Sequence, residues 1–447
     1  MSSMGKTLIS SYARVKPLGK GYSDKDGGTK SGKRITGWDE GKGEISINNE
    51  VYNHMKATLP PEATQVQCYD VICKPLVEKW LEGYDCDLLS YGQTGSGKTY
   101  TMFGPPYSME KAAKELGSGG QTISPDGILK EEHGFTLRSG FDALKIIQQY
   151  NSQPNTKAVL HGSMVEMSIM SLTDQSVQDL LNKRKTCFVD KSHHLQGAKL
   201  IPLETARDIV NLAASVETRL TRGTKMNDTS SRSHCVTVYT LSVLENKMMR
   251  QSRLQFFDLM GSERFKGGNA AHNTNSSSKS SMGGWEGIYA NLSLSALTSA
   301  VDQASKQKRS KSGKSKRMAN PMLEFCLNEL LNGSLVGNAL TGMITCVSQH
   351  PRNGDETYLT LKYGANMAKL PNYGKIQPMK PIEPILKNAK KEYASIKKIV
   401  QRGVAGKYQA LREAQLVQWT NILSLLTLLV GSNDGGGFDD ATTRKKK

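Results

Sequence analysis

One short segment constrains what this chain can fold into more than any other feature of the sequence. It reads Gly92-Gln93-Thr94-Gly95-Ser96-Gly97-Lys98-Thr99 and fits the pattern G-x-x-x-x-G-K-[ST] at every fixed position. It lies between strand-like Leu88-Leu89 and an expected helix, so backbone N–H groups can turn around phosphate oxygens. In such a loop Lys98 reaches the β and γ phosphates and Thr99 offers a hydroxyl to Mg²⁺. The motif predicts a nucleotide site and leaves open which nucleotide binds and what its hydrolysis is for.

Composition narrows the class of protein further. Apolar residues make up 37% of the 447 residues and charged residues 22%, as in soluble globular proteins. The longest apolar run, Ile422–Val430, is much shorter than the roughly 20 residues of a membrane span. The N-terminus carries no secretory signal, and the 7 cysteines form no C-x-x-C pair that would indicate zinc. We therefore expect a cytoplasmic protein without a membrane span or disulfides.

The pattern of apolar segments predicts the fold class. Val236–Leu241, Leu254–Leu259 and Met343–Val347 read as buried strands and alternate with helical stretches. Such alternation favours an α/β fold with a central, mostly parallel or mixed twisted sheet covered by helices on both faces. Segments 16–43, 117–126 and 266–284 are poor in apolar residues and read as loops or insertions.

Positive charge is concentrated in two places. The net charge is +18, and basic residues dominate one run without an acid and the last four positions, 444–447. The internal run comprises Lys306, Lys308, Arg309, Lys311, Lys314, Lys316 and Arg317. Such a run attracts a polyanion with an affinity that falls as salt rises, although it can also be a merely solvated loop.

Two more segments have the chemistry that a phosphate site needs. Asp258 ends a predicted buried strand, where a carboxylate can hold a metal ion, and Gly261 follows closely enough to bring its N–H to a γ-phosphate. Residues 227–234 read Asn-Asp-Thr-Ser-Ser-Arg-Ser-His and suit a loop that closes on a phosphate. Each of these segments alone is a common turn or loop.

Together, the three motifs in this order resemble the kinesin motor family. The phosphate loop extends to Met102, the first switch corresponds to 227–234, and the second to 258–263, with Met260 where the family usually has Ala. Flanking similarities are Arg14-Val15-Lys16-Pro17, the helix from Lys74 to Tyr84 before the phosphate loop, and the relay helix at Asn291–Leu297. The resemblance covers about residues 7–373 and implies the kinesin type of P-loop NTPase fold.

The resemblance also implies roles for individual residues. ATP would bind with Mg²⁺, its adenine held by Arg14 and Pro17 and stacked by Tyr100. Mg²⁺ would be held by Thr99, Ser231 and Asp258, and Ser230 and Ser231 would orient the attacking water. Arg232 would pair with Glu263 once both switches close, and Gly261 would sense the γ-phosphate. The partner implied is the microtubule, whose acidic surface suits the basic run at 306–317, and the expected location is the microtubule cytoskeleton.

The chain beyond the body predicts a short appendage. We expect a motor domain at 1–373, a neck linker and short neck helix at 374–403, and a C-terminal helix with a disordered basic tail at 404–447. Apolar residues of the neck follow coiled-coil spacing for two heptads: Leu386, Ala389, Tyr393, Ile396 and Val400. This seam indicates either a weak homodimer through 386–400 or packing back on the body.

Three departures from the family pattern bear on function. Residues 322–329 lack the positive charge usual before the second filament-contacting helix, and the loop 264–285 is longer than usual. Pro371, Pro378 and Pro381 remove strand donors from the neck linker, so a long paired strand is not expected there.

These features are compatible with three functions. The first is a microtubule-stimulated ATPase motor, and the alternative is a non-motile microtubule-binding structural protein that retains the ATP fold. The third, a P-loop ATPase acting on nucleic acid, rests on charge alone. The sequence lacks a basic groove interleaved with aromatic residues and contains both switch motifs, so no nucleic-acid partner is expected.

Overall fold

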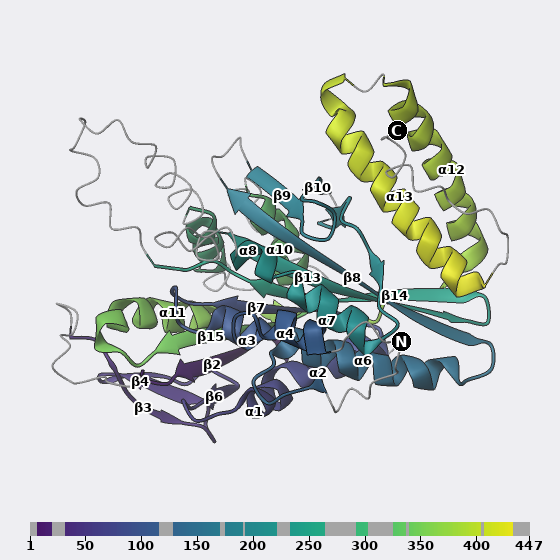
Figure 1. The fold of residues 1–447 in the computed structure, drawn as a ribbon. Helices are drawn as coiled ribbons and strands as arrows, with labels where there is room; N and C mark the ends of the chain where they lie inside the picture. The colour runs from purple at the N-terminus through teal and green to yellow at the C-terminus, as the bar shows by residue number, and fades with distance from the viewer. Residues whose placement is uncertain are drawn as a thin grey trace, which may run out of the picture.

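A long twisted sheet forms the centre of the molecule (Figure 1). The computed structural model describes residues 7–19, 32–115, 128–169, 175–190, 193–220, 233–263, 292–302, 325–336, 339–403 and 406–431. The strand order is β11-β10-β9-β8-β13-β14-β7-β15-β2-β6, with β12 beside β8 and β17 beside β14. These strands are β2 Ser10–Lys16, β6 Ala57–Leu59, β7 Asp85–Tyr91, β8 Thr156–Ile169, β9 Gln175–Asp179, β10 Thr186–Val189, β11 Leu195–Gln196, β12 Ile201–Pro202, β13 His234–Glu245, β14 Met248–Asp258, β15 Ala339–Ser348 and β17 Lys380–Pro381.

The sheet has a parallel half and an antiparallel half. Strands β14, β7, β15, β2 and β6 run parallel to their neighbours, whereas β8, β13 and β14 form a long antiparallel meander. The three predicted strands are confirmed as parts of β13, β14 and β15, although β14 ends at Asp258, one residue earlier than expected. The mixed α/β sheet expected from the sequence is therefore present.

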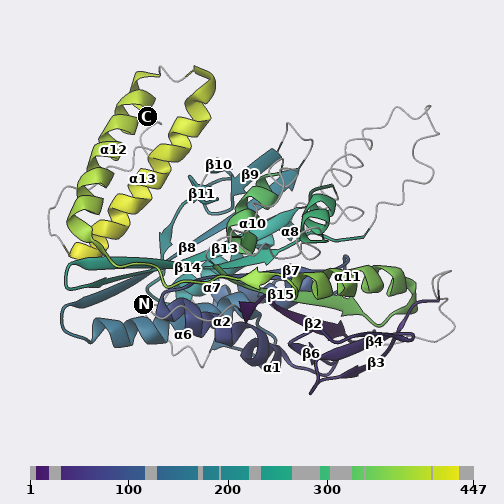
Figure 2. The same ribbon diagram turned by 180° about the vertical axis from the view of Figure 1, so that it is seen from behind.

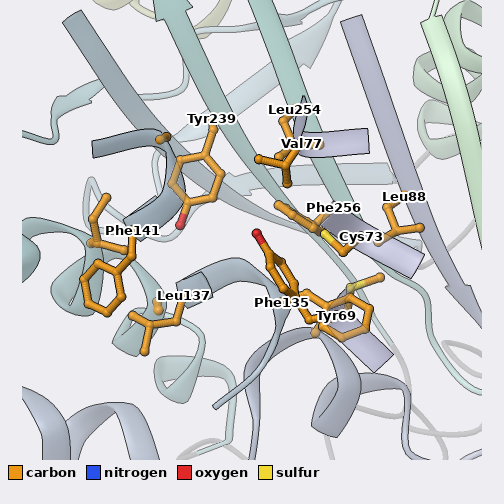
Figure 3. Close-up of a cluster of buried hydrophobic side chains, with 14 of the residues drawn as sticks. Tyr69, Cys73, Val77, Leu88, Phe135, Leu137, Phe141, Tyr239, Leu254 and Phe256 are labelled. Carbon is orange, nitrogen blue, oxygen red and sulfur yellow. The ribbon is translucent and has the colours of Figure 1, made fainter. Parts of the chain in front are cut away.

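Adjacent residues of the central strands face opposite layers of helices. Leu88 and Phe256 belong to the apolar cluster on one face, and their neighbours Leu89 and Phe257 belong to the cluster on the other. This alternation follows from the two-residue period of a strand, and it requires apolar residues at consecutive positions. Figure 3 shows the first cluster, where the ring of Tyr239 on β13 packs edge-on against Phe256.

Helices cover both faces of the sheet. On the face of Figure 3 lie α1 Gln65–Cys68, the π-helical turn η1 Tyr69–Cys73, α2 Lys74–Glu82, α3 Lys98–Phe103, α4 Ser108–Glu115, α6 Phe135–Asn151 and α7 Ala206–Ala214. On the other lie helical residues 292–302, α10 Cys326–Val336 and α11 Gly354–Met367 (Figure 2). Helical residues 292–302 coincide with the relay helix expected from the sequence.

A small three-stranded sheet packs at one edge of the body. Its strands are β3 Ile35–Asp39, β4 Glu44–Ile47 and β5 Glu50–Tyr52. Ile45 and Ile47 are buried against Val15 and Leu361, and Ile35 packs beside them. The expectation that 16–43 is loop throughout was wrong for 35–39, because Ile35 and Trp38 contact this apolar cluster. The segments 117–126 and 266–284 lie outside the described residues.

The chain after the body forms a short neck and then a helical hairpin that projects from one end of the sheet (Figure 1). The neck pairs through β16 Pro371–Asn372, beside β1 Thr7–Leu8, through a single antiparallel bridge of Ile376 with Tyr84, and through β17 beside β14. This confirms that no long paired strand forms there. The hairpin consists of α12 Ile382–Arg402 and α13 Gln409–Val430, joined through Gly403 and the 3-10 turn η5 Gly406–Tyr408.

The coiled-coil seam of the neck helix is filled by its own chain. Ala389 of α12 is buried in one cluster with Leu423 and Leu426 of α13, and Leu386 and Tyr393 of the seam pack against that cluster. The sequence left open a homodimer through 386–400 or packing back on the body; the seam packs on α13 instead, and the homodimer stays a prediction. Within the ranges given above, no helix combines the length and the apolar character that crossing a bilayer would require.

Candidate active site

The phosphate loop connects the end of β7 to the start of α3, as the motif requires. Gly97 precedes α3 in a left-handed conformation with φ +102°, which glycine adopts without strain. Gly92, with φ +149°, passes so close to the carbonyl oxygen of Cys346 on β15 that a side chain would collide with it. The two glycines allow the loop to turn sharply while it stays close to the central sheet.

Lys98 lies buried beneath this loop. Its Nζ atom donates hydrogen bonds to the carbonyl oxygens of Gly92 and Gln93, each at 2.8 Å. Burial lowers the pKa of the Lys98 ammonium, while the carboxylate of Asp258 counteracts this effect. Ser96 has a buried hydroxyl with no hydrogen-bond partner in the described part of the chain, so its donor is available to an anion bound in the loop.

Asp258 lies at the end of β14, directly beside the loop. The Thr99 hydroxyl donates to Asp258 Oδ2 at 2.7 Å, and the Ser90 hydroxyl lies 3.3 Å from Oδ1. Parallel pairing of β14 with β7 sets Asp258 opposite Ser90 and so explains this proximity. Two of the three residues expected to hold a metal ion therefore meet; the third, Ser231, lies outside the described residues.

The segment after Asp258 rests on the phosphate loop. Glu263 accepts a hydrogen bond from the Thr94 backbone N–H at 2.7 Å and a second from the Thr94 hydroxyl, and the Ser262 N–H donates to the Gly92 carbonyl at 3.0 Å. A Cβ at Gly261 would collide with the Glu263 carboxylate and with Thr94. Arg232, the expected partner of Glu263, lies outside the described residues, as does Ser230.

The residues expected to hold a base line a neighbouring cavity. This cavity has a volume of about 490 Å³, and its walls include Arg14, Pro17, Tyr100 and the loop residues Gly95 and Thr99. Arg14 Nη1 donates to Gln65 Oε1 at 2.6 Å and to Thr101 Oγ1 at 2.8 Å, and the Arg14 guanidinium lies 5.4 Å from the centre of the Tyr100 ring. Tyr100 is 41% exposed, so a planar group could stack on its ring.

Comparison with known proteins establishes the family. The kinesin motor domain model matches residues 20–370. This chain belongs to the kinesin motor family. Mouse KIF14, a kinesin-like protein, is 29% identical over 337 residues, which cover 71% of this chain and 18% of KIF14. KIN-12B of Oryza sativa subsp. japonica is 30% identical over 369 residues, covering 80% of this chain and 30% of its own. The chain thus spans less than a third of either relative.

Solved kinesin structures share the fold. A dimeric fragment of KIF14, in a two-heads-bound state with AMP-PNP and in complex with a microtubule, matches with a TM-score of 0.63 and 25% identity. The match covers 83% of this chain and 97% of the fragment. A fast kinesin gives a TM-score of 0.62 at 22% identity, covering 84% of this chain and 96% of that one.

Sequence reasoning missed a buried ion network behind this kinesin site. Arg219, in the short helix α8 Glu217–Leu220, is 1% exposed and lies 3.5 Å from Asp258 Oδ2 and 3.4 Å from Glu166 Oε1. The Ser233 hydroxyl donates to Glu166 at 2.6 Å, and Arg184 pairs with the other Glu166 oxygen. Burial alone would raise the pKa of Glu166, but Arg219, Ser233 and Arg184 together hold it below its usual value.

A buried histidine links the second switch to the relay helix. His234 Nδ1 accepts a hydrogen bond from the Met260 N–H at 3.2 Å, and Nε2 lies 3.5 Å from the Ser293 hydroxyl in helix 292–302. Burial lowers the pKa of His234 to about 3, with further lowering by Arg219 and Lys98. The imidazole is therefore neutral at physiological pH, which agrees with its acceptor role at Nδ1.

The basic run at 306–317 falls outside the described residues. Its seven members are Lys306, Lys308, Arg309, Lys311, Lys314, Lys316 and Arg317. The flanking elements, helical residues 292–302 and α10, both pack on the same face of the sheet. Its role in filament binding therefore stays a prediction.

Proposed function

We propose that this chain is an ATP-hydrolysing, microtubule-stimulated motor. The observation that carries the proposal is the meeting of two predicted motifs, the phosphate loop and the second switch. Lys98 lies beneath the loop, Asp258 bonds to its last residue, Thr99, and Glu263 bonds to Thr94. A static fold would not require an acid, a buried ammonium and a switch carboxylate on the same phosphate loop. The kinesin family assignment supports the same conclusion.

ATP would bind across the loop and the adjoining cavity. The loop N–H groups, the Ser96 hydroxyl and Lys98 would bind the phosphates, and the base would stack on Tyr100 beside Arg14 and Pro17. The Thr99 hydroxyl and the Asp258 carboxylate are oxygen ligands of the kind that Mg²⁺ prefers, and they lie together. With Ser231 they would hold the ion, which would supply positive charge to the β- and γ-phosphate oxygens.

Hydrolysis would depend on closure of the two switch segments. Phosphoryl transfer needs positioning and charge stabilisation, so Ser230 and Ser231 would orient the attacking water while Gly261 contacts the γ-phosphate. Glu263 would exchange its Thr94 contact for Arg232 when the segments close. Because His234 joins Met260 to Ser293, movement of the second switch would pass directly to the relay helix.

The filament partner is proposed to be the microtubule. The solved KIF14 fragment was in complex with a microtubule, and the net charge of +18 suits an acidic polymer. Residues 306–317 would provide the charge, and the protein would be found on the microtubule cytoskeleton. No nucleic-acid partner is proposed.

The test is steady-state ATP hydrolysis by the whole chain with and without polymerised tubulin, at low and moderate salt. We expect stimulation of at least about tenfold, falling as salt rises. Microtubule binding without any stimulation would refute the motor and leave the second candidate, a microtubule-attached structural protein.

One observation favours that second candidate: the neck is held to the body by a folded hairpin rather than ending as a free strand. A surface-immobilised chain that binds microtubules and hydrolyses ATP, yet never moves the filaments, would identify it. Gliding filaments would exclude it.

A further inference from the structure

The neck is attached to the body at several points along its length. Gln377 donates its N–H to the Gly83 carbonyl at 2.8 Å and its side-chain amide to Asp85 at 2.9 Å. Further on, Ile382 donates its N–H to the Lys247 carbonyl at 3.0 Å, next to the pairing of β17 with β14. Each attachment is small, and the prolines prevent a longer ladder. A neck held by these bonds alone would open readily.

The α12–α13 hairpin adds an apolar anchor immediately after the neck. Ile382, the first residue of α12, is 6% exposed and packs with Leu426 and Leu429 of α13. The same cluster includes residues of the body: Val159 of β8, Leu244 of β13 and Met249 of β14. The hairpin is therefore seated on the end of the antiparallel meander and does not stand free in solvent.

A second contact fixes α13 to the lobe formed by β9, β10 and β11. Ala414 of α13 is 4% exposed and lies so close to Gly197 that a side chain there would collide with it. Asn421 donates to the Ala198 carbonyl at 2.8 Å, and the Gly197 N–H donates to the Gln418 side chain at 3.3 Å. Helix α13 therefore contacts the body at two places, the meander and this lobe, and these contacts together fix the position of the hairpin on the body.

This seat is far from the nucleotide site. Strand β14 begins beside the hairpin, at Met248, and ends at Asp258 beside the phosphate loop, which places the two roughly 30 Å apart at strand spacing. None of the hairpin contacts described above involves a residue of the phosphate loop or the second switch. The contacts that seat the hairpin therefore include no group that a bound nucleotide would touch.

We propose that the α12–α13 hairpin is a clamp that keeps residues 371–382 docked on the body in every nucleotide state. One end of the neck is continuous with α11, and the other is continuous with the hairpin that packs on the body. Because both ends are held, a neck hydrogen bond that breaks keeps its donor and acceptor close together, at a high effective concentration, and forms again readily. The neck is then a fixed strap rather than a strand that docks on ATP binding. The part of the proposal in which the hairpin holds the neck is independent of the proposed function. The part that compares nucleotide states rests on the proposed function, because it requires that the protein binds ATP and ADP.

Amide hydrogen exchange on the whole chain tests the clamp. The amides of Gln377 and Ile382 are followed without nucleotide, with Mg²⁺ and ADP, and with Mg²⁺ and AMP-PNP. In the wild type we expect their exchange rates to agree within about twofold across the three states. Protection that appears only with AMP-PNP would overturn the proposal.

Variants of α13 complete the test. Leu426→Asp places a charge in the buried cluster and should accelerate exchange at Gln377 and Ile382 by about tenfold or more. Ser424→Asp, two residues away on the exposed side of the helix, is the matched control and should change neither rate. Ala414→Glu removes the lobe contact alone and should act in the same direction as Leu426→Asp, so the test does not depend on one variant.

Two control measurements accompany the exchange experiment: amide exchange in the core of the sheet, and binding of an ATP analogue. Unchanged exchange at Phe256, in the core of the sheet, shows that the body remains folded in each variant. Unchanged exchange of the neck in both Leu426→Asp and Ala414→Glu would refute the clamp. Failure of a fluorescent ATP analogue to bind would refute the proposed function, while the variants would still decide whether the hairpin holds the neck.

Discussion

Glu263 is the residue at which the two sides of the active site meet. Its carboxylate accepts hydrogen bonds from both the N–H and the hydroxyl of Thr94. The space between Glu263 and Thr94 is too small for a side chain at Gly261. The second switch is therefore in close contact with the phosphate loop, through hydrogen bonds at Glu263 and tight packing at Gly261. Any residue larger than glycine at 261 would separate the two segments.

Replacing either of two charged residues should separate binding from hydrolysis. Lys98→Ala should abolish nucleotide binding, because it removes the buried ammonium beneath the loop. Glu263→Ala should leave ATP bound but slow hydrolysis by about a hundredfold, since switch closure loses its ion pair. Nucleotide affinity and turnover are measured for each variant. Ser262→Ala, which retains its main-chain bond to Gly92, is the control; turnover by Glu263→Ala equal to wild type would contradict the assignment.

Two buried histidines should make the protein sensitive to mild acid. Burial lowers the pKa of His234 to about 3 and that of His161 to about 4, below the ordinary value near 6.5 of an unfolded chain. The unfolded state therefore binds more protons as pH falls below 6.5, and stability is lost progressively down to the folded values. From pH 7.5 to 5.5 the two groups together should cost roughly 3 kcal/mol in the free energy of unfolding.

Urea titrations across that pH range measure this loss. His234→Asn keeps an acceptor for the Met260 N–H and should remove about half of the pH dependence that these two histidines contribute. An unchanged pH dependence in this variant would show that His234 does not remain neutral in the folded state.

At the scale of elements, Arg219 connects parts of the chain that the motifs treat separately. Its guanidinium joins Glu166 on β8, Asp258 on β14 and the Ser233 carbonyl at the start of β13. Helix α7, which precedes it, is fixed at its start by a capping box between Thr205 and Asp208. The position of the strand-end acid therefore depends on a short helix that belongs to none of the predicted motifs.

Removing this guanidinium should destabilise the body. Arg219→Met leaves two buried carboxylates with one fewer counter-charge and should lower the free energy of unfolding by about 3 kcal/mol. Arg184→Met removes a partner of Glu166 whose side chain is 18% exposed, and should cost about 1 kcal/mol. Denaturant unfolding compares the two; equal losses would show that Arg219 has no special place in the network.

Short-range patterns predicted much of the site, and long-range ones did not. Thr99 and Asp258 could be paired from the sequence because each belongs to a motif of fixed order, and β7, which leads into the phosphate loop, pairs with β14, which Asp258 ends. Arg219 and Glu166 are 53 positions apart and belong to no repeating pattern, so only folding shows that they meet. The seam on α12 was visible as a spacing, but spacing does not specify which partner fills it.

At the scale of the whole molecule, charge should govern attachment to the filament. Replacing Lys308, Lys311, Lys314 and Lys316 by Gln should weaken microtubule affinity by about tenfold at low salt and flatten its salt dependence. The matched control replaces the exposed Lys387, Lys390, Lys391 and Lys398 of α12, which removes the same charge elsewhere. Cosedimentation at several salt concentrations provides the measurement; equal losses in both variants would assign the effect to net charge alone.

The reversal of the chain between α12 and α13 sets the reach of anything attached beyond it. Helix α12 extends for 21 residues, or about 32 Å, and α13 returns over 22 residues to Gly431, where a Cβ would lie 3.9 Å from the Lys157 ammonium on β8. Because the two helices have nearly equal lengths and run in opposite directions, α13 ends close to the level at which α12 began. A load joined after residue 431 is therefore attached beside the sheet, so a small rotation of the body displaces it by far less than the tip of an extended stalk would move.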